Sequence, residues 1–562
     1  MNFFFSTPMT HIMLFISSLF LFINQAPATS CNLCKSSVYH LDSLINSSTG
    51  IGLFKSALTE ACKLFPEKSM DIVGESNNCQ GKKNCDILCK GMIDEFIGEF
   101  VYIATKTTIS PQDVCSLIKL CPKIPHKPYI VPNNTLINSN TTDYSGEPHF
   151  NNWNNNTGLG KFIQITDIHL DIYYKQGYHT NCGLPICCRP DSNSYSNDNV
   201  NISKKWGSPY GKCDIPIALL KSVLNFTSNN IDNVDSIFLT GDGPPHDIWE
   251  QSRRYNLNVN DAIRTFTKYY FPNTSVFPII GNHDTFPINQ EPGLTQSDWL
   301  YKNLSMRWKY WFSNDSLNTF NFGGFYTQRV KPGFRIIGLN TNVYPKENWW
   351  QSLYNKDDYG HQLAWLRDVL NQSKVNQEKV IILAHHSPNN WYSKEFIDYY
   401  TNLLLEYSDI IEISIYGHQH SGPSLRLFYN NSTPKSFGIV GGSLTTYTEL
   451  NPTFTVYIYN RTTNKIIDFE IWWADLINIS DDINWVMQYK FLERHNINSL
   501  NPVDLDIFAK SLLTNKTNWE NYKNDYYRNI SQSDGGKTNI ELYCEIISLN
   551  QEEYKVCLNN NI

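Results

Sequence analysis

The sequence has few charged residues and no basic excess. Lysine, arginine, aspartate and glutamate make up 18% of the 562 residues, and the formal net charge at pH 7 is −7. Nucleic-acid binding favours a basic face, so the composition gives no support to that class of function. Hydrophobic residues reach 41%, which is typical of a folded chain rather than a disordered one. No internal repeat is apparent, and at this length we expect roughly two to four domains.

Long apolar runs are also missing. The apolar stretch near the start, residues 12–23, is too short for a comfortable membrane span. It is followed by Ala26-Pro27-Ala28, a small-residue cleavage pattern, although the segment before it has no lysine or arginine. We therefore predict a secretory signal peptide over residues 1–28, with an uncleaved anchor as the alternative. Because no later stretch is long and apolar enough to span, we expect a soluble mature protein without a transmembrane anchor, and a monomer.

Cysteine, in contrast, is plentiful. The fourteen cysteines form an even number in clustered spacings, which indicates disulfide bonds and an oxidising compartment. The chain also carries many Asn-x-Ser/Thr sequons, although so asparagine-rich a sequence contains some by chance. We expect a secreted glycoprotein, or one in the lumen of lysosomes or endosomes. The sequons considered are at Asn46, Asn140, Asn201, Asn225, Asn273, Asn303, Asn371, Asn460 and Asn529.

Eight of the cysteines lie within residues 31–121, between segments with helical periodicity. Apolar residues recur on one helix face over residues 51–65 and again over residues 92–103. Ser110 and Pro111 have the residue types of a helix start, with serine as the cap and proline in the first turn. Short helices tied by disulfides form a small domain whose core is otherwise marginal. We place this domain at residues 29–122.

The cysteine-rich segment resembles a saposin B-type domain. In that family the first two cysteines pair with the last two and a third bridge joins the middle, which leaves Cys79 and Cys85 to pair with each other; this extra pair departs from the six-cysteine pattern. Spacing alone does not fix the connectivity. Saposin domains open apolar helix faces onto lipid, so the resemblance implies contact with membrane lipid at a bilayer surface, and we expect Phe96 and Phe100 to be exposed there. The alternative is a disulfide-stapled module with no lipid role. The implied bridges are Cys31–Cys121, Cys34–Cys115, Cys62–Cys89 and Cys79–Cys85.

The remaining chain divides into three parts. Residues 123–158 are rich in proline and asparagine and predict a stiff linker. Residues 159–475 alternate short apolar runs with helical stretches such as 261–270 and 360–371, which indicates α/β layers. Residues 476–562 predict helices over 481–494 and 502–513 and an aromatic face, with no visible chemistry.

Six further cysteines lie in these later parts. Two of them are adjacent in sequence, so they are expected to pair outward, with a redox or metal role as the alternative. The last two are expected to close the C-terminal region. The expected bridges are Cys182–Cys187, Cys188–Cys213 and Cys544–Cys557.

Five polar clusters each follow an apolar run that predicts a buried strand. Asp, His and Asn side chains gathered from strand ends are the donors that a two-metal hydrolytic centre requires. Singly these signals are weak, because glycine, asparagine and aspartate also suit turns and a lone histidine after a strand is more often structural. Five clusters together are much harder to obtain by accident. They are Asp167-Ile168-His169, Gly241-Asp242, Gly281-Asn282-His283-Asp284, Ala384-His385-His386 and Gly417-His418-Gln419-His420.

The order of these clusters resembles the calcineurin-like metallophosphoesterases, and the resemblance implies a two-sheet sandwich flanked by helices. Within them the chain resembles the acid sphingomyelinase family. The similarity covers nearly all of the mature chain and rests on the cysteine-rich region, the cysteines of residues 182–213, residues 241–249, residues 445–447 with 451–452, and the terminal cysteine pair. Two cysteine pairs of that family have no counterpart here. The family's activity implies hydrolysis of sphingomyelin to ceramide and phosphocholine.

When the metal ligands of the family are carried over to the matching positions, the resemblance also implies two metal ions bridged by Asp242. His386 competes with His385 for its place. Nitrogen and oxygen ligands of this kind suit zinc, with manganese or iron as alternatives. Purple acid phosphatases have tyrosine three residues after the bridging aspartate, where this chain has Pro245, so a tyrosinate–iron(III) centre is not expected. The cofactors are therefore predicted to be two divalent ions, zinc foremost. The implied ligands are Asp167, His169, Asp242 and His420 for the first ion and Asp242, Asn282, His385 and His418 for the second.

A ceramide alkoxide is a poor leaving group, so its departure needs a proton donor. We expect His283 to be this acid, with His246 as the second candidate and Asp284 as the residue that orients His283. A hydrogen bond that only braces the loop is the alternative role for His246. We expect Asn282 and the metal ions to stabilise charge on the phosphoryl oxygens.

Three functions compete at this point. The first is a phosphodiesterase that cleaves sphingomyelin. The second is a phosphodiesterase for nucleotides or other soluble phosphoesters, and the third is a non-enzymatic, saposin-like lipid-binding protein. The intact ligand set argues against the third function, and the lipid-handling domain argues against the second.

Overall fold

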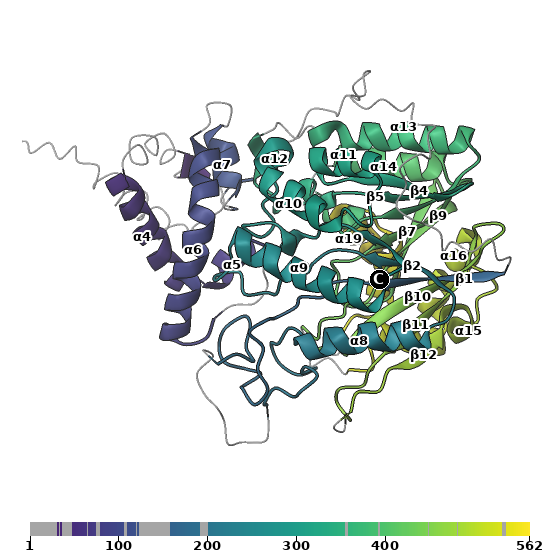
Figure 1. Cartoon of the computed structure of the whole chain (residues 1–562). Coiled ribbons are helices and arrows are strands. Elements are labelled where there is room, and N and C mark those ends of the chain that lie inside the picture. Colours follow the sequence, from purple (N-terminus) through teal and green to yellow (C-terminus); the bar gives the residue numbers. More distant parts are fainter. Residues whose placement is uncertain are drawn as a thin grey trace, which may run out of the picture.

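A computed structural model of the chain shows its fold (Figure 1). The predicted signal peptide and most of the predicted linker, with Asn46 and Asn140, lie outside the residues that the structure describes. Within the described ranges, no helix is both long and apolar enough to cross a membrane. The described residues are 31–32, 34–35, 48–64, 66–74, 79–105, 110–117, 119, 121–122, 158–190, 201–353, 358–391, 394–447, 449–479, 482–530 and 536–561.

The N-terminal unit is a helical, disulfide-tied structure. Helices α4 and α6 lie against each other, and Phe54 stacks on Phe100 with ring centroids 6.1 Å apart. The bridge Cys62–Cys89 joins these two helices, and all four bridges implied for this region are confirmed. The helices are α4 (Ser48–Leu64), α5 (Pro66–Ile72), α6 (Lys82–Ala104) and α7 (Pro111–Leu117).

Two six-stranded mixed sheets form the large domain and confirm the expected sandwich. Their strand orders are β12-β11-β10-β1-β2-β3 and β4-β5-β6-β7-β9-β8. Strands β1, β2 and β3 run parallel, as do β5, β6 and β7, so each set brings its carboxyl ends to one edge. The first sheet contains β1 (Leu159–Ile165), β2 (Val234–Leu239), β3 (Ser275–Pro278), β10 (Thr453–Asn460), β11 (Ile466–Trp473) and β12 (Val486–Lys490). The second contains β4 (Tyr326–Lys331), β5 (Phe334–Gly338), β6 (Lys379–Leu383), β7 (Ile411–Tyr416), β8 (Ser424–Asn430) and β9 (Thr433–Val440).

The main hydrophobic core lies between the two sheets. Phe162 of β1 meets Phe334 of β5 across the interface, with ring centroids 5.9 Å apart. Neighbouring residues of one strand point to opposite faces. In β5, Ile336 therefore joins the shared core, whereas Ile337 belongs to a second core beneath the outer helices.

Helices cover the outer faces of the sheets (Figure 1). Helices α8 and α9 pack against each other beside the first sheet, and α13 and α14 lie over the second. The helical stretch predicted at 261–270 is part of α9, and residues 362–371 of the stretch predicted at 360–371 belong to α13. The helices are α8 (Ile217–Asn230), α9 (Arg253–Tyr270), α10 (Asp298–Trp308), α11 (Asn314–Gly323), α12 (Trp350–Leu353), α13 (Gln362–Val375) and α14 (Lys394–Glu406), with short 3₁₀ turns η1 (Asn282–Asp284), η2 (Leu294–Ser297), η3 (Thr341–Val343), η4 (Tyr359–His361) and η5 (Pro388–Asn390).

The C-terminal region is built onto the sheets. The segment 481–494, predicted as a helix, instead contains β12 and the short helix α15 (Phe491–His495). The prediction was wrong because the open edge of β11 offers backbone partners, and residues 486–490 pair with it antiparallel. The helix predicted at 502–513 is confirmed as α16 (Pro502–Thr514), which packs on β9. The chain continues with α17 (Lys516–Tyr526), α18 (Asn539–Ile547) and α19 (Gln551–Asn561), and the bridges Cys182–Cys187, Cys188–Cys213 and Cys544–Cys557 are confirmed.

The N-terminal unit packs its apolar face against the large domain. Phe96 and Phe100, expected to be exposed, are only 3% and 6% exposed. Both rings lie against Trp349, with centroids 5.6 and 6.0 Å from it, and their core cluster includes Trp249. Gly91 of α6 comes so close to the Trp249 carbonyl that a side chain at this position would collide with it. The exposure prediction was wrong because tryptophans of the same chain cover this face.

Candidate metal centre

The polar clusters lie in tight turns at the strand ends. Asp167, His169, Asp242 and His418 have φ angles of 47°, 44°, 58° and 69°. Residues other than glycine rarely adopt this left-handed conformation, and such strain concentrates at functional sites. Hydrogen bonds between neighbouring loops hold the turns, for example from the His169 N–H to the Asp242 carbonyl at 3.0 Å. The backbone thereby directs side chains from several loops toward one place.

Asp167, His169 and His420 form one group of potential metal ligands. Asp167 and His169 are fully buried. Nε2 of His169 lies 3.1 Å from Nε2 of His420, and the latter atom lies 3.8 Å from Oδ1 of Asp167. The Asp167 carboxylate also accepts the backbone N–H of His418, at 2.9 Å to Oδ1 and 3.1 Å to Oδ2, which ties the loop after β1 to the loop after β7.

Asn282, His385 and His418 form a second group around one amide oxygen. Oδ1 of Asn282 lies 2.9 Å from Nε2 of His385 and 3.0 Å from Nδ1 of His418. Asp242 lies between the two groups, with Oδ2 3.1 Å from Nε2 of His385 and 3.5 Å from Nε2 of His169. Burial lowers the pKa of His385, but the Asp242 carboxylate outweighs burial and raises the pKa to about 9. This position therefore favours a positive charge.

The contacts of the histidine rings show whether the residues fit metal ions. Nδ1 of His169 and Nδ1 of His420 lie 2.8 and 2.5 Å from backbone carbonyl oxygens, so each Nδ1 carries a proton and each Nε2 presents a lone pair. These lone pairs face each other at 3.1 Å and repel unless a cation lies between them. Burial holds the pKa of His169 well below its ordinary value, so this ring disfavours a proton at the contact. The donor set therefore fits divalent metal ions.

His386 is buried beside the second group. Its ring centroid lies 4.2 Å from that of His418, and Nδ1 makes no hydrogen bond to any described residue. Asp242 and Asn282 face His385 instead. The geometry thus puts His385 at the shared carboxylate and His386 next to it.

His246 lies beside the first group and is held by a buried carboxylate. Its ring stacks on His169 and on Tyr447, with centroids 4.0 Å away in each case. Nδ1 of His246 lies 3.0 Å from both carboxylate oxygens of Asp214, which also accepts the His246 backbone N–H at 2.7 Å. Burial raises the pKa of Asp214 to about 7, against the hydrogen bonds from His246 and Thr445. These contacts fix the ring and leave Nε2 on the side away from Asp214.

His283 packs edge-on against the same rings. Its centroid lies 4.6 Å from that of His169 and 4.5 Å from that of His246. Nδ1 lies 3.3 Å from the carbonyl oxygen of Pro245, and the backbone N–H donates to Oδ1 of Asp242 at 2.8 Å. Burial lowers the pKa of the His283 ring to about 3.

Asp284 has a different role from the one expected. Its carboxylate accepts the N–H groups of Gly281 at 2.6 Å, Asp242 at 3.2 Å and Gly243 at 3.3 Å, and the side-chain amide of Asn260 at 2.9 Å. These contacts brace the loops that carry Asn282 and Asp242, and the expected orientation of the His283 ring by Asp284 is not among them.

Comparison with known proteins places this centre in a family. Residues 160–422 match a family model described as calcineurin-like phosphoesterase. Sphingomyelin phosphodiesterase B of Dictyostelium discoideum is 27% identical over 89% of this chain and 76% of that protein. Sphingomyelinase phosphodiesterase C of the same organism is 33% identical over 71% of this chain and 92% of that protein. Cyclic GMP-AMP phosphodiesterase SMPDL3A of Bos taurus is 30% identical, over 71% and 90%.

The chain belongs to the acid sphingomyelinase-type phosphodiesterases. It is therefore a hydrolytic phosphodiesterase of the calcineurin-like class, and the alternative of a non-enzymatic lipid-binding protein is set aside. Membership of this family implies divalent metal ions at the His and Asp groups described above.

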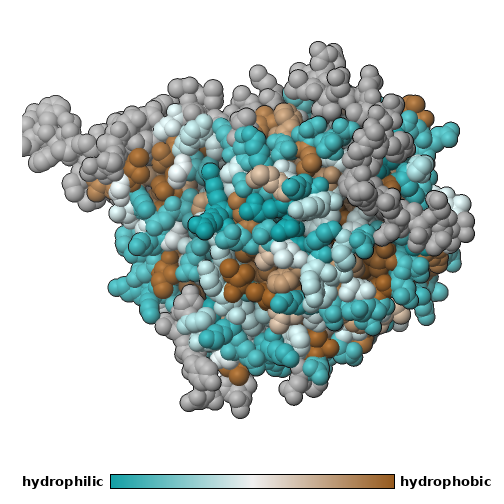
Figure 2. All heavy atoms as spheres, in the orientation of Figure 1, coloured by the Kyte–Doolittle hydropathy of each residue, from teal (hydrophilic) through white to brown (hydrophobic). Residues whose placement is uncertain are grey.

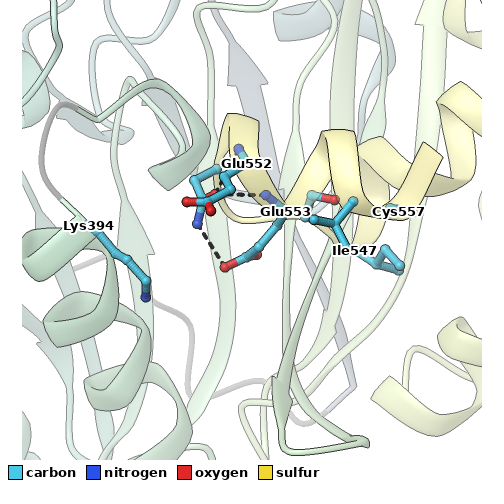
Figure 3. A pocket seen from close by; sticks show the side chains of 8 residues that line it. Lys394, Ile547, Glu552, Glu553 and Cys557 are labelled. Carbon is cyan, nitrogen blue, oxygen red and sulfur yellow. Dashed lines mark hydrogen bonds between the residues drawn. The ribbon is translucent and has the colours of Figure 1, made fainter. Parts of the chain in front are cut away.

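An open cavity lies elsewhere on this phosphodiesterase and plays no part in the centre. Its volume is about 430 Å³, and none of the predicted metal ligands lines it. Figure 3 shows Lys394 of α14 on one side and Glu552 and Glu553 of α19 on the other. None of the groups of potential metal ligands among the described residues lies at this cavity.

Two residues of the centre were missed by the sequence analysis. Asp214 directly follows a cysteine in an irregular loop, and no strand-end pattern marks it. Arg528 lies in the C-terminal region, where the sequence showed no chemistry, yet its guanidinium donates to the backbone carbonyl of His420. Both roles depend on contacts between segments far apart in sequence, which motif spacing does not reveal.

Proposed function

We propose that this phosphodiesterase cleaves sphingomyelin to ceramide and phosphocholine at a two-metal centre. The observation that carries the proposal is the convergence of two ligand groups on the single carboxylate of Asp242. The names of the relatives support the substrate. One relative, a sphingomyelin phosphodiesterase, aligns with 89% of this chain. Residues 1–158 make up more than a quarter of the chain, so the alignment must include part of this N-terminal segment.

The residues divide into two ligand sets that share one carboxylate. When bound, two divalent ions activate a water as the nucleophile and clamp the phosphoryl oxygens. Oδ1 of Asn282 faces the ligand groups, so its amide N–H₂ is free to stabilise charge on a phosphoryl oxygen. We assign Asp167, His169, Asp242 and His420 to the first ion and Asp242, Asn282, His385 and His418 to the second, with zinc in both.

His246 becomes the first candidate for the acid, which reverses the order expected from the sequence. A general acid needs a fixed ring and a partner that stabilises its charged form. Asp214 fixes the ring at Nδ1, which leaves Nε2 of His246 to pass a proton to the leaving alkoxide. Burial and the nearby His420 hold the pKa of His246 well below its ordinary value, so the protonated ring is a strong acid. His283, through its backbone N–H, holds the shared carboxylate of Asp242, and its ring is the second candidate.

Lipid contact is assigned to the outer face of the N-terminal unit. Leu53 and Leu64 of α4 and Ile87 of α6 are 39%, 57% and 38% exposed. Figure 2 shows hydrophobic side chains on the face formed by α4 and α6. We propose that these residues touch the bilayer surface, in the oxidising compartment that the confirmed disulfides suit. We also propose that the protein is secreted or lies in the lysosomal lumen, and that it is glycosylated.

A phosphodiesterase acting on soluble phosphoesters is the second candidate. The observation that favours it is the burial of Phe96 and Phe100 against the large domain, which removes the most apolar helix face from contact with lipid. The cyclic GMP-AMP phosphodiesterase relative points the same way.

The deciding experiment compares substrates with purified, secreted protein. Turnover of sphingomyelin, phosphatidylcholine and a cyclic dinucleotide is measured before chelation, after chelation and after zinc is returned. We expect sphingomyelin to be cleaved best, with choline phosphate released only while metal is present. Preference for the dinucleotide moves the second candidate to first place, and chelator-resistant turnover rejects the two-metal centre.

A further inference from the structure

The ligand loop after β7 rests on the C-terminal region. The Gly422 N–H donates to the carbonyl of Tyr526 at 3.0 Å. Gln419, which lies between the two ligand histidines of this loop, accepts a hydrogen bond from Arg426, and Arg426 pairs with Glu545 of α18 at 2.8 Å. The loop is therefore held from both sides by residues outside the motif.

Arg528 makes the most direct of these contacts. Its side chain is fully buried, and its backbone has a positive φ of 53°. Nη1 donates to the carbonyl oxygens of Ser443 at 2.8 Å and Asn451 at 2.6 Å. Nη2 donates to the carbonyl oxygen of His420 and to Oγ of Ser443. One guanidinium thus joins the loop that carries His420 to the loop that follows β9.

The burial of Arg528 is costly and is not offset by an ion pair. Among the residues that the structure describes, no carboxylate lies within ion-pair distance of its guanidinium. A buried charge of this kind is unfavourable unless hydrogen bonds compensate it. The planar fork of arginine reaches separate carbonyls from two nitrogens in a fixed geometry, whereas lysine presents its three donors from a single point.

We propose that Arg528 is a positioning residue for His420, so that the C-terminal region completes the metal centre. This inference rests on the proposed two-metal centre. His420, whose carbonyl Arg528 contacts directly, belongs to the group of Asp167 and His169. His418 of the same loop belongs to the other group, but its backbone N–H is also held by Asp167. Asn282 and His385 hold that second group from separate loops. Loss of the clamp therefore affects the first ion more than the second.

The test uses Arg528→Gln and Arg528→Lys in the full secreted chain. Metal content is measured by elemental analysis after dialysis against graded chelator, together with the thermal unfolding midpoint of the metal-free protein. We expect both variants to fall from about two tightly held ions to about one, with a 10–100-fold weaker affinity for the ion lost. Added zinc should restore turnover of a nitrophenyl phosphodiester. Should Arg528→Gln fail to fold, Arg528→Lys keeps the positive charge and decides the question.

Arg494→Gln is the matched control. Arg494 pairs with Asp525 at 3.0 and 3.1 Å, so its loss loosens the same C-terminal region without touching the ligand loop. We expect it to lower the unfolding midpoint while keeping two ions. The inference is overturned if an Arg528 variant retains both ions as tightly as the parent, or if Arg494→Gln loses the same single ion. A parent protein that binds no metal overturns the proposed centre itself.

Discussion

The shared carboxylate of Asp242 is the residue on which both ligand groups depend. It lies within 3.5 Å of a histidine from each group, and its position is fixed by the backbone N–H of His283. Substitution with asparagine keeps the shape and removes the charge that binds two cations. The rest of the fold keeps its disulfides, so the variant should still fold.

We predict that Asp242→Asn lowers turnover by about 100-fold or more and reduces the bound metal below two ions. Elemental analysis and a diester hydrolysis assay measure the two effects. Asp368→Asn, an aspartate paired with Arg367 on the surface of α13, is the control and should behave as the parent. Near-normal turnover in Asp242→Asn contradicts the ligand assignment.

The second prediction at this scale concerns the acid. His246→Gln and Asp214→Asn should each slow sphingomyelin cleavage, the former by about 100-fold. Both should be much less harmful with a nitrophenyl diester, because this leaving group departs without a proton. His283→Gln is compared in the same assay. If only His283→Gln discriminates between the two substrates, the assignment of His246 is wrong.

Sequence motifs predicted the site residues that follow strands and did not predict those that lie elsewhere. Asp167, Asp242 and His385 each come directly after an apolar run, and parallel strands bring such positions to one edge of a sheet. Asp214 and Arg528 lie in irregular segments and reach the centre only through tertiary contacts. The sequence left His386 as a competitor of His385, whereas the structure distinguishes them by which ring faces Asp242.

At the scale of elements, hydrophobic pattern predicted where helices and strands form better than what they pack against. The periodicity of residues 92–103 correctly indicated a helix with one apolar face. The sequence did not indicate that Trp249 and Trp349 cover this face, because they come from distant loops. The same limit applies to β12, which is a strand because β11 lies beside it.

Helix α6 also carries a carboxylate at the interface with the large domain. Oε1 of Glu95 accepts the Gln251 N–H at 2.8 Å. Burial, followed by the nearby Asp247, Glu250 and Asp94, raises the pKa of Glu95 to about 9, although the bond from Gln251 opposes this shift. The packed state therefore binds a proton that an exposed glutamate, with an ordinary pKa of 4.5, releases.

The sign of the pH dependence follows from this raised pKa. The contribution of Glu95 to packing is fully present below pH 4.5 and is lost as the pH rises toward 9. We predict that Glu95→Gln flattens the fall of the unfolding midpoint between pH 5 and pH 8, because the amide accepts the same hydrogen bond without a charge. Glu60→Gln, on the exposed side of α4, is the control. Equal pH profiles for Glu95→Gln and the parent contradict the prediction.

At the scale of the whole molecule, the helical unit and the metal centre are joined through one apolar interface. Trp249 follows His246 by three residues, and Tyr447 both stacks on His246 and belongs to the core cluster of the interface. Removing residues 31–121 would uncover these aromatic side chains next to the centre. Such a deletion mixes loss of lipid contact with damage to the site, so point substitutions on the two faces of the unit separate the roles better.

Substitutions on the outer face and on the inner face of the N-terminal unit should have different effects on stability and activity. The double variant Leu53→Asp with Leu64→Asp changes side chains that are already exposed, so stability and turnover of a detergent-dispersed substrate should be kept. Each large side chain that enters lipid contributes about 1.5–3 kcal/mol, so cleavage of sphingomyelin in liposomes should fall by about 10-fold or more. Phe96→Asp buries a charge against Trp349 and should instead lower the unfolding midpoint and both activities.

Binding to vesicles, measured by sedimentation, and turnover on the two substrate forms distinguish these outcomes. If the double variant binds and cleaves liposomes as well as the parent, the outer face is not the lipid contact, and the soluble-phosphoester function gains the stronger claim.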